Sequence, residues 1–209
     1  MHNPLIGPGA SDAGGIAARR GFRVQDHVAA RLAIEMLRDP AIEQLECETA
    51  DDIVLRRTEG GEAVFEYVQV KTTEKDAKWS ITELTARDKN RKRSSVCEKS
   101  LLCDIHGETA WFRLVTTRAI STKLSPFKLS RSNRTGSSDF NDLLVSFGKR
   151  FRDVKSASGR SLGDWAKQLL WEVEGDESAL VSRNVNPMLA LAAGRGPTPA
   201  FELMQDTYS

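Results

Sequence analysis

Three residues in the first half of the chain, Asp52, Gln69 and Lys71, have side chains that could together act on a phosphate ester. A carboxylate and an amide supply oxygen ligands of the kind that Mg²⁺ accepts. A divalent cation held there would polarise a phosphoryl oxygen and lower the pKa of an attacking water. A lysine ammonium group beside it would stabilise the negative charge that develops during the reaction. These residue types therefore indicate metal-assisted hydrolysis of a phosphodiester, provided that the fold brings them together.

A β-hairpin is the element that must position these side chains. Short runs of β-branched and apolar residues predict strands over Asp52–Arg57 and Ala63–Lys71. Between them lies Thr58-Glu59-Gly60-Gly61, whose two glycines tolerate the positive φ of a tight turn. If the turn centres on Gly60 or on the Gly60–Gly61 bond, the numbers of paired residues sum to 120 or 121.

Either register places the candidate residues at the open end of the hairpin. Asp52 then lies opposite Val68 or Gln69, and directly opposed Cβ atoms are roughly 5 Å apart. Side chains alternate along a strand, so Gln69 and Lys71 share one face. The Val70 carbonyl is available as a further oxygen ligand. Taken alone, Lys71 is better explained as an exposed charge at the end of a strand, so the prediction depends on the whole set.

The rest of the chain predicts one mixed α/β domain. Apolar residues at helical spacing predict a helix over Phe22–Arg38, which Asp39-Pro40 ends. Residues 1–21 are rich in Gly, Ala and Pro and predict a flexible, extended arm. Trp79 lies in a polar stretch and is expected to be exposed. Further strands are expected over 42–47 and 110–116, with helices near 94–105, 139–152 and 161–172. The domain is expected to span 22–209, with its core over 22–120 and a helical part over 121–209.

Positive charge is concentrated in the middle of the chain, although the net charge is only +1. Residues 71–160 contain 20 of the 30 Lys and Arg residues but only 10 of the 29 Asp and Glu residues. Such a segment could present a positive face to a polyanion, although a chance cluster of solvated charges has the same composition. Its densest basic stretch is expected to contact DNA backbone phosphates: Arg87, Lys89, Arg91, Lys92 and Arg93. Further candidates are Lys149, Arg150 and Arg152.

The hairpin pattern, an aspartate followed on the next strand by an acid or amide, one residue and a lysine, resembles that of the PD-(D/E)xK nucleases. Longer segments resemble the N-terminal nuclease domain of the CBASS double-stranded DNA endonucleases over residues 14–120: GGIAARRGFRVQDHVAARLAIEML, ECETADDIVL, EYVQVKT, SVCEKSLLCDI and WFRLVTTR. Lamassu-type defence systems contain related nuclease domains. The resemblance implies a restriction-endonuclease-like fold, in which helices flank a mixed central sheet and the C-terminal part is helical. It also implies Mg²⁺-dependent cleavage of double-stranded DNA in anti-phage defence, with Mn²⁺ as an alternative metal.

The resemblance also implies a role for individual residues. Asp52 matches the metal-binding aspartate, Gln69 the middle acidic or amide position, and Lys71 the catalytic lysine. Gln25 on the first helix matches the helical polar residue that commonly lines the site, with its neighbour Asp26 as the alternative. A further set of metal ligands is expected to include the Val70 carbonyl and Glu48, while Asp51 is expected to be a turn residue or a helper. An amide at the middle position is a weaker ligand than a carboxylate, which leaves the number of bound metals open.

Partners and location follow from the same resemblance and from the composition. Three cysteines without a CxxC pair argue against a disulfide framework and against structural zinc, which favours a cytoplasmic protein. No apolar run approaches the length of a membrane span, and no secretory signal is expected. The resemblance implies a cyclic-oligonucleotide sensor domain or a defence-complex partner outside this chain, and an oligomer when active. His27 and His106 are expected to be structural. The alternative functions are an inactive DNA-binding module and an assembly domain that meets an acidic partner.

Overall fold

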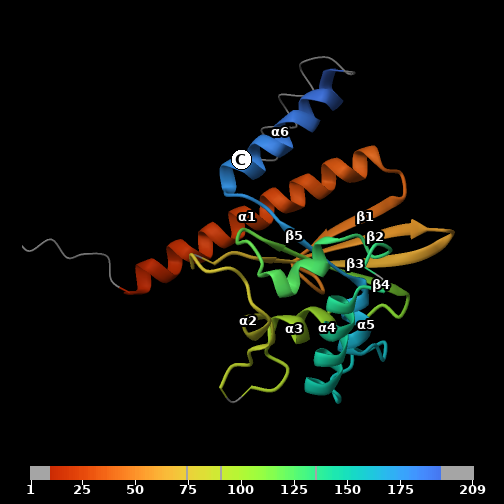
Figure 1. The fold of residues 1–209 in the computed structure, drawn as a ribbon. Helices are drawn as coiled ribbons and strands as arrows, with labels where there is room; N and C mark the ends of the chain where they lie inside the picture. The colour runs from red at the N-terminus through yellow and green to blue at the C-terminus, as the bar shows by residue number, and fades with distance from the viewer. Residues whose placement is uncertain (1–9, 74, 90, 135, 194–209) are drawn as a thin grey trace, which may run out of the picture.

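The computed structural model describes residues 10–73, 75–89, 91–134 and 136–193, and one mixed sheet lies at its centre. The strands lie side by side in chain order (Figure 1): β1 (Ile42–Cys47), β2 (Ile53–Glu59), β3 (Glu62–Lys71), β4 (Thr109–Thr116) and β5 (Leu169–Val173). The pairs β1–β2 and β2–β3 are antiparallel, whereas the pairs β3–β4 and β4–β5 are parallel. The mixed central sheet predicted from the sequence is therefore confirmed.

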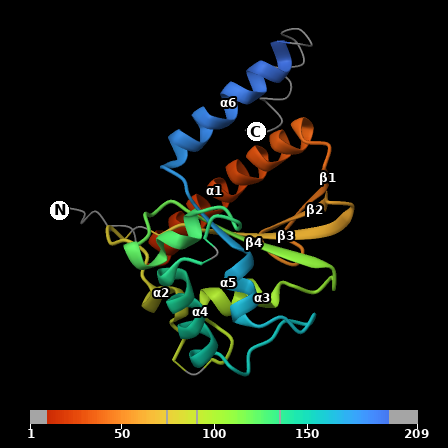
Figure 2. The same cartoon turned by 45° about the vertical axis from the view of Figure 1, so that its right-hand side comes forward.

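Helices cover both faces of this sheet (Figures 1 and 2). On one side lie α1 (Ala10–Arg38) and α6 (Glu177–Ala193). The other side carries α2 (Ile81–Thr85), α3 (Val96–Leu102), α4 (Ser138–Arg150), α5 (Leu162–Gln168) and the 3₁₀ helix η1 (Thr122–Lys128). Within the described part of the chain, no helix combines the length and the apolar composition needed to cross a bilayer.

Two apolar clusters form the core, one on each face of the sheet, because side chains alternate along the strands. Below α1, the cluster includes Val28, Leu32, Ile53, Leu55 and Val68. The larger cluster on the opposite face contains most of the aromatic side chains. Consequently, odd-numbered residues of β2 face α1, and Asp52, just before β2, is placed to face the other helical layer.

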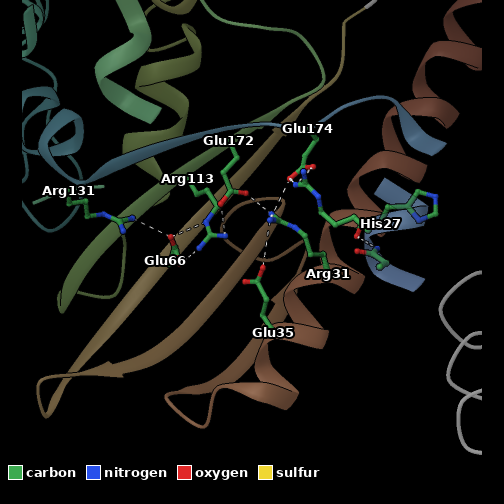
Figure 3. Close-up of polar contacts among 10 residues, drawn as sticks. His27, Arg31, Glu35, Glu66, Arg113, Arg131, Glu172 and Glu174 are labelled. Atoms are coloured by element: carbon green, nitrogen blue, oxygen red, sulfur yellow. Dashed lines mark hydrogen bonds and ion pairs between the residues drawn. The ribbon is translucent and has the colours of Figure 1, made fainter. Parts of the chain in front are cut away.

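Buried ion pairs occupy the part of the α1 face that the apolar cluster leaves free (Figure 3). Glu66 on β3 accepts hydrogen bonds from Arg113 on β4, at 2.9 and 3.1 Å. Arg113 also bonds Glu172 on β5, and Glu172 accepts a 2.6 Å hydrogen bond from Arg31 on α1. The same chain of charges extends to Glu35, Arg131, Glu174 and Arg183. These pairs tie α1 and α6 to three adjacent strands.

The N-terminal arm was predicted wrongly over residues 10–21, which form the first three turns of α1. Alanine is the residue with the highest helix propensity, and four alanines (Ala10, Ala13, Ala17 and Ala18) offset the cost of Gly14 and Gly15. Residues 1–9 lie outside the described residues.

The helix predicted over 161–172 is wrong in its second half. The helix α5 starts with a capping box in which Ser161 and Asp164 exchange hydrogen bonds, and it ends at Gln168. From Leu169 the chain continues as β5, parallel to β4, which buries Leu169 and Trp171. Pairing with a distant strand therefore overrides the helical continuation.

Trp79 was expected to be exposed, but only 3% of it is accessible. Its backbone pairs with the segment after β4, through hydrogen bonds from Trp79 to the Ala119 carbonyl and from Ser121 to the Trp79 carbonyl. The ring packs edge-on against Trp171, with centroids 5.9 Å apart. Trp79 is therefore a core residue that fixes the segment after β3.

Candidate active site

The β2–β3 hairpin has the register that brings the candidate residues together. Ile53 pairs with Val68 and Glu59 with Glu62, so paired numbers sum to 121, one of the two predicted values. Gly60 and Gly61 have φ values of 59° and 88°, in the left-handed region that glycine enters without strain. Asp52 consequently lies at the open end of the hairpin, one residue before β2, beside the last residues of β3.

The Asp52 carboxylate reaches across to β3. Its Oδ2 atom accepts a 2.7 Å hydrogen bond from the Val70 backbone amide, and the Lys71 ammonium nitrogen lies 3.8 Å from the same atom. About a quarter of the Asp52 side chain (27%) and 31% of the Lys71 side chain are exposed. The carboxylate is therefore held in a fixed place, and both charged groups are open to a molecule arriving from solvent.

Gln69 supplies an oxygen that lacks a partner. The residue is only 5% exposed, and its Oε1 atom has no hydrogen-bond partner among the described residues. A buried polar atom left without a hydrogen bond costs roughly 1–3 kcal/mol. Because Gln69 shares a strand face with Lys71, this oxygen is suited to a ligand that enters beside the Asp52 carboxylate. The side chains of Asp52, Gln69 and Lys71 were predicted to converge, and the geometry is consistent with that.

Asp51 is a half-buried neighbour of the candidate residues. Its Oδ1 atom accepts a 2.9 Å hydrogen bond from the Asp52 amide, which fixes the backbone at the start of β2. Burial raises the pKa of Asp51 to about 7, against smaller lowering effects from that hydrogen bond and from Lys71. The thiol of Cys103, next after α3, lies beside this carboxyl. Asp51 thus fixes the backbone of Asp52, and the Asp51 carboxyl stays protonated up to near-neutral pH.

Gln25 and Glu48 contact the Asp52 backbone. The side-chain amide of Gln25 on α1 donates a 3.4 Å hydrogen bond to the Asp52 carbonyl. The backbone amide of Glu48 donates to the same oxygen at 3.0 Å. Glu48 is exposed and has a positive φ of 56°, so it turns the chain between β1 and β2. Both residues therefore adjoin the site, and their predicted roles, Gln25 as a site-lining residue and Glu48 as a ligand, stay predictions.

A divalent cation would have to be held by a mixed set of oxygens. The described residues contain no group of three or more His, Cys, Asp or Glu side chains placed to hold a metal. The Asp52 carboxylate and the unpaired Gln69 oxygen nevertheless suit a hard cation, which accepts amide and carboxylate oxygens and keeps several waters. The Val70 amide is committed to Asp52, and the use of its carbonyl as a ligand stays a prediction. The residues present therefore fit such an ion.

The basic stretch before α3 is divided in its environment. Arg87 forms a bidentate ion pair with Glu98, which is completely buried, so its charge is compensated. Lys89, Arg91, Lys92 and Arg93 are exposed. Their predicted contact with DNA stays a prediction, whereas Arg87 has a structural partner that the sequence pattern did not reveal. A glutamate three residues after a helix-capping serine, Ser95, was the available signal for it.

The two histidines expected to be structural have core or interface partners. His106 accepts or donates a 2.7 Å hydrogen bond with the Tyr67 hydroxyl and stacks on Phe65 at 4.0 Å between centroids. His27 is 8% exposed and lies 3.7 Å from the Glu177 carboxylate of α6. His106 therefore packs against β3, and His27 lies beside α6.

The fold is an α/β domain in which helices flank a mixed sheet, with Asp52 and Lys71 meeting at the open end of its antiparallel hairpin. Residues 13–188 match the family model of the Cap4 dsDNA endonuclease domain. The chain therefore belongs to the Cap4 dsDNA endonuclease domain family.

Two known proteins are similar to this chain. Anti-bacteriophage protein A of Escherichia coli strain K12 is 31% identical over 170 residues, which cover 78% of this chain and 31% of that protein. A solved structure of the Acinetobacter baumannii Cap4 SAVED/CARF-domain containing receptor, with the cyclic trinucleotide 3'3'3'-cAAA, superposes with a TM-score of 0.53 at 16% identity. The superposed region covers 90% of this chain and 38% of the receptor, and this likeness supports the fold. This chain spans about a third of the length of each relative.

Proposed function

We propose that this chain is a metal-dependent endonuclease that cleaves the phosphodiester bonds of double-stranded DNA. The observation that carries the proposal is the convergence of the Asp52 carboxylate and the Lys71 ammonium group, 3.8 Å apart, beside the unpaired buried oxygen of Gln69. Membership in the Cap4 dsDNA endonuclease domain family supports the choice of substrate.

The ion we propose is Mg²⁺, with Mn²⁺ as a substitute, held by Asp52 and Gln69, with the Val70 carbonyl and Glu48 as further proposed ligands. When bound, such an ion polarises a phosphoryl oxygen and makes a bound water a stronger nucleophile. The Val70 amide orients the Asp52 carboxylate, because it donates a hydrogen bond to one oxygen and leaves the other free of that contact. Lys71, which is partly exposed, is placed to stabilise negative charge on a phosphate or to orient the attacking water.

The test is a Lys71→Ala variant assayed on supercoiled plasmid with Mg²⁺, with an EDTA control. Loss of a positioned charge at a developing oxyanion costs about 10²–10³-fold in rate, so we expect cleavage to fall by at least 100-fold while the protein stays folded. Lys75→Ala is a matched control, because Lys75 is a neighbouring exposed lysine paired with Glu83. Undiminished, metal-dependent cutting by folded Lys71→Ala would remove Lys71 from the mechanism. If the unmodified chain binds DNA but never cuts it, the chain is an inactive DNA-binding module instead.

We propose further that the activity serves anti-phage defence in the cytoplasm. Support for a role in defence comes from the family and from the similarity to anti-bacteriophage protein A of E. coli. That the chain spans about a third of its relatives, one of which is a SAVED/CARF-domain receptor with a bound cyclic trinucleotide, supports a cyclic-oligonucleotide sensor domain as a partner. The predicted oligomer in the active state is tested by sedimentation of the chain with and without DNA.

A further inference from the structure

A second site of strong positive charge lies away from the hairpin, in a cavity of about 320 Å³. The segment between α2 and α3 forms one wall, and the C-terminal end of α4 with the residues after it forms the other. Five cations, one carboxylate and two apolar residues line it: Arg87, Lys92, Arg93, Arg150, Arg152, Asp153, Phe151 and Val154. Two segments about 60 residues apart in sequence therefore bring their basic groups to one cavity.

Arg87 joins the two walls and contributes little free charge. Its guanidinium pairs with the buried Glu98 of α3 at 2.9 and 3.0 Å, and it lies 5.2 Å above the ring of Phe151 at the end of α4. Phe151 is 4% exposed, and Glu98 is completely buried. Arg87 is therefore a positioning residue that holds the cavity in shape.

The other cations are available to a ligand. Among the residues that the structure describes, no carboxylate forms an ion pair with Lys92, Arg93 or Arg152. Arg150 donates a 3.3 Å hydrogen bond to the Thr85 carbonyl and keeps its charge uncompensated. Four cations thus face one carboxylate, Asp153. A concentration of like charge with so little compensation is stabilised by an anion.

The segment that carries Lys92 and Arg93 is ordered by its own hydrogen bonds. The Ser94 hydroxyl accepts from the Asp88 amide and donates to the Arg91 carbonyl, both at 2.8 Å. Arg93 itself has a positive φ of 59°, which is uncommon outside glycine and turns the chain at this point. The two cations are therefore presented from a closed turn.

The chemistry of the lining favours a phosphate. Its cations are arginine and lysine side chains, and the Phe151 ring is covered by Arg87 and Arg150, so it is not free to stack on a base. Lysine and arginine contacts to phosphate give affinity that does not depend on sequence. The cavity is therefore suited to the sugar–phosphate backbone of DNA.

Its position relative to the hairpin suits one continuous duplex. The cavity adjoins the N-terminal end of α3, and Cys103, just after its C-terminal end, lies beside Asp51. A helix of seven residues is roughly 10 Å long. Successive phosphates on one strand are spaced about 3.4 Å along the duplex axis, so a few base pairs bridge the two places.

We propose that this cavity, lined by Lys92, Arg93, Arg150 and Arg152, binds a backbone phosphate of duplex DNA and anchors the duplex about one short helix away from the Asp52–Lys71 site. The proposal rests on the proposed nuclease function for its choice of duplex. It adds a second anchoring site to that function, formed in part by the end of α4.

The test is duplex binding by a Lys92→Ala/Arg152→Ala double variant of the full chain, measured by fluorescence anisotropy in EDTA over a series of salt concentrations. Both residues are exposed, so the variant is expected to fold. We expect about tenfold weaker binding at low salt and a salt slope smaller by about two, one for each lost phosphate contact. Two duplexes of unrelated sequence should lose the same affinity. Lys128→Ala/Lys167→Ala, which removes two exposed lysines outside the cavity, is the matched control.

An unchanged salt slope, a loss no larger than that of the control, or a loss confined to one duplex sequence would overturn the proposal. So would a parent chain that does not bind duplex DNA at all. A further outcome would reassign the cavity to a small anion: inorganic pyrophosphate binds the parent chain but not the variant, while both proteins bind duplex DNA equally well. Plasmid cleavage is scored separately: a chain that never cuts but shows the expected change in slope refutes the nuclease and leaves the anchoring site intact.

Discussion

Asp52 is the residue on which the proposed chemistry depends, because its carboxylate contacts both the Val70 amide and the Lys71 ammonium group. The Val70 amide bonds it at 2.7 Å and Lys71 lies 3.8 Å away. The neighbouring Asp51 is half-buried, and desolvation of its carboxyl raises its pKa to about 7. Two adjacent aspartates therefore have distinct environments: the Asp52 carboxylate lies beside Lys71, whereas the Asp51 carboxyl accepts a hydrogen bond from the Asp52 amide.

An Asp52→Asn variant separates metal binding from folding. The amide oxygen can still accept from Val70, so the fold is expected to persist, whereas the negative charge that attracts a divalent cation is lost. A bound ligand at 100 times its Kd stabilises a protein by about 2.7 kcal/mol. We expect Mg²⁺ to raise the Tm of the parent chain and to leave that of Asp52→Asn unchanged, with DNA cleavage abolished.

Differential scanning calorimetry with a Mg²⁺ titration provides the measurement. Asp142→Asn is the control, because Asp142 is an exposed aspartate on α4, away from the hairpin. Equal Mg²⁺-induced shifts in all three proteins would argue against a cation at Asp52.

At the scale of elements, the ion pairs under α1 are unusual because they replace apolar packing over part of the sheet. Glu66 is completely buried and bonds Arg113 and Arg131. Burial alone would raise its pKa, but the two guanidinium groups outweigh burial, and the pKa of Glu66 lies below its ordinary value of 4.5. Glu66 is therefore charged in the folded protein, and its charge is needed by Arg113.

We expect Glu66→Gln to destabilise the fold by about 3 kcal/mol at pH 7, because removing one partner of a buried pair leaves the other uncompensated. A carboxyl whose pKa is lowered on folding contributes stability above its unfolded pKa and loses it as pH falls. The difference between parent and variant should therefore be constant from pH 7 to 5 and shrink below about pH 4.5.

Urea unfolding at pH 7, 5 and 4 measures this difference. The exposed Glu43, which pairs with Arg56 on the surface, gives the control variant Glu43→Gln, with an expected effect of less than about 1 kcal/mol. A Glu66→Gln effect that grows as pH falls would mean that Glu66 is protonated in the folded chain.

At the scale of the molecule, α6 completes the layer that α1 begins. Asn184 on α6 is completely buried and donates a 2.8 Å hydrogen bond to the His27 carbonyl on α1. Leu180 is also completely buried, in the cluster below α1. The last described helix is therefore packed onto the first, which makes both ends of the described chain part of one structural unit.

Leu180→Ala is expected to destabilise the whole domain by about 2–4 kcal/mol, the usual cost of emptying a core position. Leu189→Ala on the same helix should cost less than about 0.5 kcal/mol, because nearly half of Leu189 is exposed (48%). Thermal unfolding followed by circular dichroism compares the two. If Leu180→Ala leaves the main transition unchanged, α6 unfolds independently of the sheet.

The amino-acid sequence by itself determined the hairpin. A double glycine leaves two registers, and only the one in which paired numbers sum to 121 puts Asp52 on the strand face of Gln69 and Lys71. The structure has this register. These are local constraints, carried by about twenty consecutive residues, so a pattern is enough to read them.

Only the tertiary structure decided the features that depend on contacts between distant segments. The residues after Gln168 became β5 because β4 offers a strand edge. Asp51 acquired its raised pKa because the surrounding chain buries it. The basic cavity formed because the end of α4 packs beside the segment before α3, and Glu98 removed Arg87 from the free charges. Burial, charge compensation and strand pairing are properties of neighbours in space, and the order of residues along the chain does not specify which neighbours those are.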